Sequence, residues 1–294
     1  MNSTPYKGDD MIDQERNKRI NKIPISLSFA LLFVGLGCPK VKAQGGPPYV
    51  TNDPGTPGNK QWEINIGYEP YYHSGNYVSH TPDIDINYGF GDFVQLTVET
   101  AYLTANLPPA RPGDSGSLMP NTPNVTYHGL EQSEIGVKWR FYDNEKRKFA
   151  MSVFPQVQLN NPNLTVAHGL ATRGSGIILP MEFTKSLGPV DVNFELGYYP
   201  IHYGPNYWLT GLVVGHELTK KWEVDAEFYA TQAVNGTGKY YTGAGGARFK
   251  IHPPFILLLM AGRSLVNSTS SQPYFLGYFG MQFLLPPKPF DQDP

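Results

Sequence analysis

Residues 190–198 read Val-Asp-Val-Asn-Phe-Glu-Leu-Gly-Tyr, a run in which apolar and polar side chains alternate. Successive side chains of an extended strand point to opposite faces, so this run has one apolar face and one polar face. The same alternation appears in residues 62–69, 83–90, 94–99, 134–141 and 222–228. The pattern predicts a protein built from antiparallel strands.

Weaker alternation fills most of the remaining chain. It predicts further strands at residues 149–159, 176–185, 207–218, 239–251, 255–265 and 273–285. The total is about 12, an even number as single-chain outer-membrane barrels require. The runs are long enough to cross a bilayer when tilted, whereas strands of ordinary globular proteins have about five or six residues. We therefore expect an all-β fold, an antiparallel transmembrane β-barrel, over residues 61–285.

The links between the expected strands differ in length in a regular way. Short links lie at residues 89–92, 142–148, 186–189, 219–221 and 252–254, while those at 104–130 and 160–173 are long and that at 202–206 is brief. A barrel whose chain starts in the periplasm has short inner turns and longer outer loops. Aromatic residues flank the short links, as an inner interfacial girdle requires: Phe90, Phe93, Phe141, Phe149, Trp222 and Phe249.

Composition excludes several functions. Only 16% of the residues are charged and the net charge is −2, so nothing indicates a nucleic-acid partner. The sole cysteine, Cys38, lies in the N-terminal leader, which excludes disulfides, thiolate metal sites and cysteine catalysis from the mature chain. We expect no cofactor, with outer-membrane lipid and a small-molecule solute as partners; the sequence does not determine the oligomeric state.

Residues 1–43 have the pattern of a cleaved signal peptide, which predicts export to the bacterial outer membrane. A basic stretch containing Arg16 and Arg19 precedes an apolar run at 23–37, and Val41-Lys42-Ala43 forms a small-residue cleavage site. Lipidation of Cys38 and a retained anchor are alternatives, although the apolar run is shorter than the ~20 residues that a bilayer needs. Both Met1 and Met11 are candidate initiators.

Two further segments flank the expected barrel. Residues 44–60 are rich in Gly and Pro and contain the turn sequence Asn52-Asp53-Pro54-Gly55, so we expect irregular structure there, either a plug or a periplasmic arm. Residues 286–294 form a short C-terminal tail.

The polar faces of the expected strands would line a lumen, because a membrane barrel turns its apolar faces to lipid. The candidate lumen residues are Glu63, Asp83, Asp85, Glu99, Glu134, Lys138, Arg140, Asp191, Glu195, Glu223, Asp225, Glu227, Arg248, Lys250 and Arg263. The carboxylates could select cations or bind a polar solute, or they could pair with the basic residues and hold a narrow lumen shut.

Three runs resemble an outer-membrane transporter family named for the meta-pathway of phenol degradation. They are Gly46-Pro47-Pro48-Tyr49-Val50-Thr51-Asn52-Asp53-Pro54-Gly55-Thr56-Pro57-Gly58 with the following Trp62-Glu63-Ile64-Asn65, residues 85–96, and residues 134–141. The resemblance spans residues 46–285 and implies a channel or transporter for small solutes of aromatic or hydrophobic character. It carries no catalytic motif.

Other functions remain as alternatives. A hydrolase could use Ser133, Glu134 and His216, but no Gly-x-Ser-x-Gly motif occurs, so we do not expect an enzyme. Histidines in expected outer loops could meet at a metal, although their spacing is not that of a metal site: His73, His80, His128, His168 and His202. A barrel without an open pore and a secreted β-sandwich that binds a ligand complete the alternatives.

Overall fold

The computed structural model describes residues 45–111, 114–119, 121–159, 175–202, 204–236, 238–266 and 273–286. The predicted signal peptide and residues 287–294 of the predicted tail lie outside this part of the chain. Within the described residues, no helix is long and apolar enough to cross a membrane.

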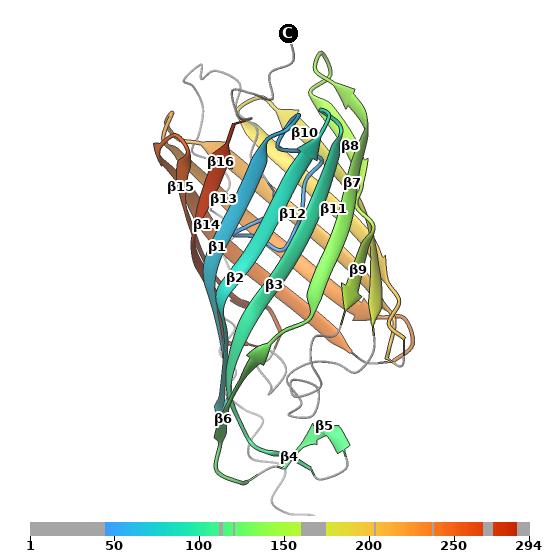
Figure 1. Ribbon diagram of the computed structural model, residues 1–294, viewed down its shortest axis with the longest axis vertical. Coiled ribbons are helices and arrows are strands. Elements are labelled where there is room, and N and C mark those ends of the chain that lie inside the picture. Colours follow the sequence, from blue (N-terminus) through green and yellow to red (C-terminus); the bar gives the residue numbers. More distant parts are fainter. Residues whose placement is uncertain are drawn as a thin grey trace, which may run out of the picture. The chain divides into compact units, whose positions relative to one another are not determined.

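The described residues form strands joined by turns and loops. These strands are β1 (Trp62–His73), β2 (Asn76–Phe90), β3 (Val94–Leu107), β4 (Ala110–Arg111), β5 (Asp114–Leu118), β6 (Val125–Leu130), β7 (Ser133–Asn144), β8 (Phe149–Val153), β9 (Gln156–Leu159), β10 (Gly176–Leu187), β11 (Val190–Tyr199), β12 (Tyr207–Glu217), β13 (Trp222–Ala233), β14 (Lys239–His252), β15 (Phe255–Ser264) and β16 (Phe275–Leu285). All but β4 and β5 belong to one sheet (Figure 1).

The sheet closes on itself. β1 pairs with β16, and β3 pairs with both β6 and β7, so β6 and β7 together make one barrel strand. β8 and β9 make another, interrupted at Phe154 and Pro155, where proline has no N–H to donate to the ladder. The barrel therefore has 12 antiparallel strands. The predicted fold class is confirmed, and the alternative of a two-sheet sandwich is wrong.

The first hairpin is longer than the sequence pattern indicated. We expected residues 70–82 to lie in an outer loop, but β1 and β2 continue through them and only residues 74 and 75 separate the two strands. Tyr72 and Tyr77 are register partners with ring centroids 4.9 Å apart, and the hydroxyl groups of Tyr68 and Tyr77 are 2.8 Å apart. Such cross-strand aromatic pairs stabilise the extended hairpin.

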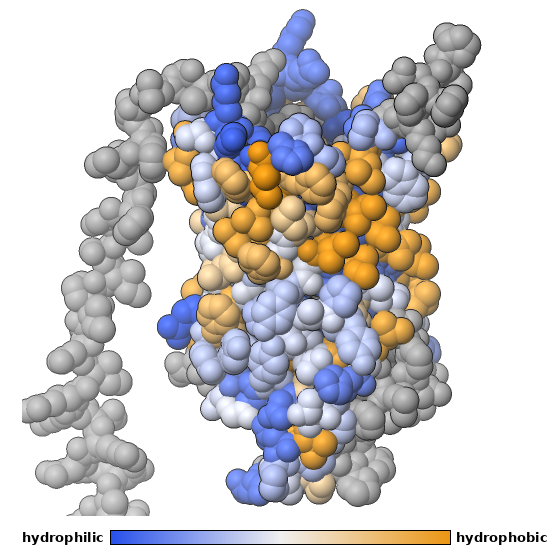
Figure 2. Space-filling model, turned by 60° about the vertical axis from the view of Figure 1, so that its left-hand side comes forward, coloured by the Kyte–Doolittle hydropathy of each residue, from blue (hydrophilic) through white to orange (hydrophobic). Residues whose placement is uncertain are grey.

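The outer surface of the barrel is apolar, as a lipid-facing wall should be. Among the expected girdle residues, Phe90 is 68% exposed and Phe93 52%, and Phe141 and Trp222 are also exposed. Figure 2 shows apolar side chains gathered toward one end of the visible wall, with more polar residues toward the other end. Exposed apolar side chains at this density indicate contact with a bilayer.

The inner surface of the barrel is mostly polar, with one apolar exception on the strands near the closure of the sheet. Ile256, Leu258 and Met260 of β15 and Leu276 of β16 are buried and form one cluster with Tyr49. The inward face of β15 is therefore apolar, unlike the inward face of β13, which contains Glu223, Asp225 and Glu227.

Candidate functional site

Residues 45–60, here called the N-terminal segment, run inside the barrel. The blue trace in Figure 1 passes between the front and back walls, and the contacts of the segment reach strands on several sides. Within the segment, the N–H of Gly46 donates to the carbonyl of Thr51, and the Asp53 carboxylate accepts from the N–H groups of Gly45 and Gly55. Its Gly-rich and Pro-rich sequence thus folds into compact turns.

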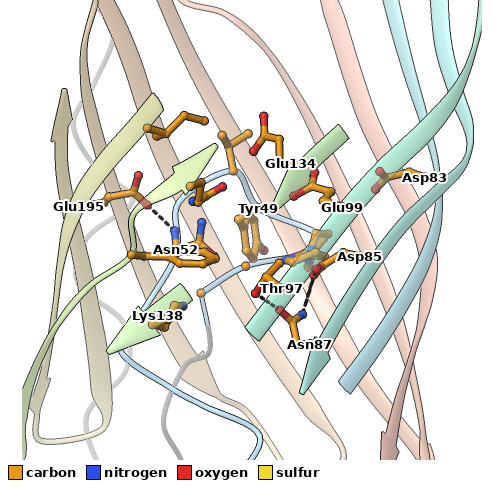
Figure 3. Close-up of a pocket in the computed structure, with 18 of the residues that line it drawn as sticks. Tyr49, Asn52, Asp83, Asp85, Asn87, Thr97, Glu99, Glu134, Lys138 and Glu195 are labelled. Carbon is orange, nitrogen blue, oxygen red and sulfur yellow. Dashed lines mark hydrogen bonds between the residues drawn. The ribbon is translucent and has the colours of Figure 1, made fainter. Parts of the chain in front are cut away.

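Two lumen carboxylates accept hydrogen bonds from the main chain of the segment. The N–H of Thr51 donates to Glu227 Oε1 at 2.8 Å, and the N–H of Asn52 donates to Glu195 Oε2 at 2.6 Å (Figure 3). Both carboxylates are almost fully buried. These two contacts join the main chain of the segment to β11 and β13 and so fix its position in the lumen.

Two lumen cations bind the carbonyl groups of the same segment. Lys138 Nζ donates to the carbonyl of Asp53 at 2.6 Å and lies 3.4 Å from Glu182 Oε2. Arg248 Nη2 donates to the carbonyls of Gly45 and Gly46 at 3.2 and 3.1 Å. Carboxylates on one set of strands and cations on another thus satisfy both kinds of main-chain polar group that the segment buries.

Tyr49 and three wall glycines make the fit close. The Tyr49 ring packs on the apolar cluster, and its hydroxyl donates to the carbonyl of Asp225 at 3.4 Å. Burial raises the pKa of the Tyr49 phenol above its ordinary value, which keeps the hydroxyl protonated. A Cβ atom at Gly89, Gly211 or Gly246 would overlap Gly58, Thr51 or Tyr49, so the wall leaves room for the segment at these points.

A cavity of about 400 Å³ lies beside the N-terminal segment. Figure 3 shows Asp83, Asp85, Glu99 and Glu134 on one side of it and Glu195 on the other, with Tyr49 between. The volume is within the range of about 300–1,000 Å³ that is typical of small-molecule sites.

Part of the acidic wall of this cavity is held by internal hydrogen bonds. His80 lies between two carboxylates, with Nδ1 2.8 Å from Glu69 Oε2 and Nε2 3.3 Å from Glu131 Oε2. Asp85 accepts from the amides of Asn65 and Asn87, at 3.0 Å and 2.9 Å. By contrast, Asp83 and Glu99 form no side-chain hydrogen bond or ion pair with any described residue.

The structure places most of the candidate lumen residues on inward faces of the wall. These are Glu63, Asp83, Asp85, Glu99, Glu134, Lys138, Asp191, Glu195, Glu223, Asp225, Glu227 and Arg248. Two cations lie at the short-turn rim instead: Arg140 donates to the carbonyl of Asp92, and Lys250 lies 3.3 Å from Glu217.

The inward assignment of Arg263 is wrong. Leu258, Met260 and Ser264 are the buried positions of β15, so the alternation places Arg263 on the opposite face. The sequence pattern predicts that the polar positions of this strand face the lumen. The inward face of β15 is apolar instead, because its side chains pack against Tyr49.

The histidine and hydrolase alternatives do not match the structure. His73, His80 and His128 lie in strands rather than loops, and His168 lies outside the described residues. No group of His, Cys, Asp and Glu side chains in the described part of the chain is arranged to hold a metal. Ser133 begins β7 at the end of the barrel with the long loops, whereas His216 lies beside the short 188–189 turn, so the two do not meet.

Sequence reasoning did not assign Tyr49 or Tyr278 to the site, and it placed His80 in an outer loop as a possible metal ligand. Tyr49 and His80 gave no periodic signal, since the first lies in an irregular segment and the second in an expected loop. Tyr278 looked like one of several aromatics in the last strand, although Gly67 and Gly280 make room for its ring beside the cavity. Glycines that interrupt an alternating pattern on neighbouring strands were the available signal.

Solved structures with a similar fold include several outer-membrane barrels. An outer membrane channel from Pseudomonas putida F1 has a TM-score of 0.57 and 12% identity, covering 79% of this chain and 98% of that one. The KdgM porin has a TM-score of 0.51 and 9% identity, covering 75% and 98%. The NanC porin has a TM-score of 0.50 and 7% identity, covering 76% and 99%.

No family model matches the chain, and no curated protein matches it in sequence. The predicted membership of the phenol-pathway family therefore stays a prediction. At such low identities the structural likeness establishes the fold alone, and the fold of this chain is that of the outer-membrane channel barrels.

Proposed function

We propose that this chain is an outer-membrane channel for small solutes and that its N-terminal segment closes the lumen at rest. One observation carries the proposal: the main chain of the segment is hydrogen-bonded to Glu195, Glu227, Lys138 and Arg248 on the inward faces of four strands. A segment that is bonded to several walls of the lumen occupies part of its cross-section and so obstructs the passage of solutes.

The bonds that hold the segment can be exchanged for bonds to water. Each is worth about 0.5–3 kcal/mol net, because water competes for the same groups when the segment leaves. The segment is joined covalently to β1 alone among the described strands, so it can leave the lumen while the barrel stays intact. These features support a gated channel over a permanently sealed barrel.

The export route and the solute class belong to the same proposal. Cleavage after Ala43 would release the mature chain from its leader and place residues 44–60 at its N-terminus. The inward cluster of Ile256, Leu258, Met260 and Leu276 offers an apolar surface to a solute that displaces Tyr49. An aromatic or hydrophobic solute, which the family resemblance implies, suits such a surface.

Single-channel recording tests the proposal. The mature protein and a variant lacking residues 45–59 would be refolded, checked for heat-modifiable migration, and inserted into planar bilayers in KCl. We expect rare openings from the mature protein and a steadily open, larger conductance from the deletion variant. If neither the mature protein nor the deletion variant conducts, a barrel without an open pore is favoured. If both conduct steadily and equally, the segment is excluded as a gate.

A further inference from the structure

One side of the cavity is rich in carboxyl groups to which the proposed gating of the channel gives no role. Carboxyl groups of β1, β2, β3 and β7 line it, including Glu69, Asp83, Asp85, Glu99 and Glu134. The basic residues of the lumen have other partners: Lys138 and Arg248 bind the N-terminal segment, and His80 lies between Glu69 and Glu131. Carboxyl groups therefore outnumber basic groups around the cavity, and a cation placed among them would favour their ionised form.

Asp83 and Tyr278 distinguish this wall from an ordinary solvated acidic surface. Asp83 is 9% exposed and Tyr278 5%, yet neither Asp83 nor the Tyr278 hydroxyl has a hydrogen-bond partner among the described residues. Both line the cavity. A buried polar group without a partner is unfavourable, so a ligand that supplies the missing hydrogen bonds would bind favourably.

Glycines bring the Tyr278 hydroxyl to the acidic wall. The ring extends from β16 over Gly280 and Gly67, where a Cβ atom would overlap it. Gly67 is the register partner of Asp83 on β2, so the hydroxyl of Tyr278 lies next to the strand that carries Asp83. The Tyr278 hydroxyl then faces one space with two carboxylates that have no hydrogen-bond partner among the described residues, Asp83 of β2 and Glu99 of β3.

The remaining walls of the cavity combine polar side chains, including Gln156, Gln158 and Thr231, with a few apolar ones. Ile178 of β10, Leu209 of β12 and Phe154 also line it. These side chains could contact an apolar body but offer no hydrogen bonds to a charged or hydroxylated one. The cavity therefore fits a ligand with a cationic end and an apolar end.

We propose that the cavity binds a small organic ammonium ion, its cationic group among Asp83, Glu99 and the Tyr278 hydroxyl and its apolar body against Ile178 and Leu209. This inference rests on the proposed channel function and names the solute class that the lumen selects. An inorganic cation would use the carboxylates but gain nothing from the apolar wall, whereas a neutral aromatic alcohol could donate one hydrogen bond to a carboxylate but would lack the attraction between opposite charges.

Calorimetric titration of the full mature protein in detergent with 2-phenylethylammonium tests the inference, with 2-phenylethanol as the neutral probe. We expect saturable binding of the ammonium ion alone. The Asp83→Asn/Glu99→Gln double variant should weaken it at least about tenfold, and Tyr278→Phe about threefold, since each loses contacts to the charged group. A matched control, Asp92→Asn/Glu145→Gln, makes the same charge change at exposed turns and should leave binding unchanged.

Three results would overturn the inference: equal binding of both probes, unchanged binding in the double variant with migration that marks a folded barrel, or saturable Mg²⁺ binding that 2-phenylethylammonium does not displace. Calorimetry measures binding without an open pore, so a negative result for binding can be told apart from a negative result for conduction. Silent bilayers with intact binding would contradict the proposed function, while a conducting protein without binding would contradict this inference alone.

Discussion

Two regions of the lumen use the same residue types differently. Glu195 and Glu227 accept hydrogen bonds from the main chain of the N-terminal segment, whereas Asp83 and Glu99 face the cavity without such partners. Both pairs are carboxylates on inward faces of neighbouring or alternate strands. The role of a carboxylate in this lumen therefore depends on which group lies opposite it and not on its charge alone.

Release of the segment can be measured directly because the sequence offers a clean label. The only native cysteine is Cys38 in the predicted leader, so Thr51→Cys would carry the single thiol of the mature chain. Thr51 is fully buried, and cysteine is close to threonine in size, which makes the exchange mild. The rate of maleimide labelling then reports how often the segment leaves the lumen.

Arg248→Met should have the largest effect on that rate. It removes two charge-assisted hydrogen bonds to the carbonyls of Gly45 and Gly46, each worth about 1.5–3 kcal/mol. Because about 1.4 kcal/mol is a factor of ten, labelling in the Thr51→Cys background should rise by about 100-fold or more. Lys220→Met, at an exposed turn, is the control; equal rates in the two variants would show that Arg248 does not hold the segment.

Leu258→Ala should lower the free energy of unfolding by about 2–5 kcal/mol, since Leu258 is fully buried against Tyr49 and Met260. Leu259→Ala, on the outward face of the same strand, should cost less because its side chain faces lipid. Urea unfolding in detergent micelles measures both. Similar losses for the two variants would contradict the assignment of an apolar inward face to β15.

Glu227→Gln and Glu99→Gln test whether the carboxylates of the two regions affect release of the segment differently. The first weakens a bond to the N–H of Thr51 by about 1 kcal/mol and should raise Thr51→Cys labelling about fivefold. The second should leave labelling unchanged, because Glu99 lines the cavity and forms no hydrogen bond with a described residue of the segment. Labelling that rises equally in both would mean that the lumen responds to total charge alone.

Lys250→Met should have the smallest effect. The pair of Lys250 and Glu217 lies at the rim, 3.3 Å apart, with the lysine side chain 39% exposed. Exposed ion pairs contribute about 0.2–1 kcal/mol, so both the labelling rate and the unfolding free energy should stay within that range of the parent. A larger change would indicate that the rim takes part in closing the lumen.

The number and direction of the strands followed from the sequence. Side chains alternate between faces along a strand whatever the strand pairs with, so residues 190–198 and 222–228 revealed their two faces locally. The rule failed for Arg263, because the face of β15 that looks inward is apolar where it packs against Tyr49. The rule also missed the outer part of the first hairpin, where tyrosine side chains of β1 and β2 pack against each other.

The sequence by itself determined a chain of alternating strands with an acidic polar face, because these are properties of neighbouring residues. Only the tertiary structure decided what each polar group meets. Thr51 and Glu227 are 176 positions apart, and Asn52 and Glu195 are 143 apart. Closure of the sheet brings such residues together, and strand pairing also places Tyr278 beside Asp83. Contacts across a lumen depend on the register of every strand between them, which no local pattern specifies.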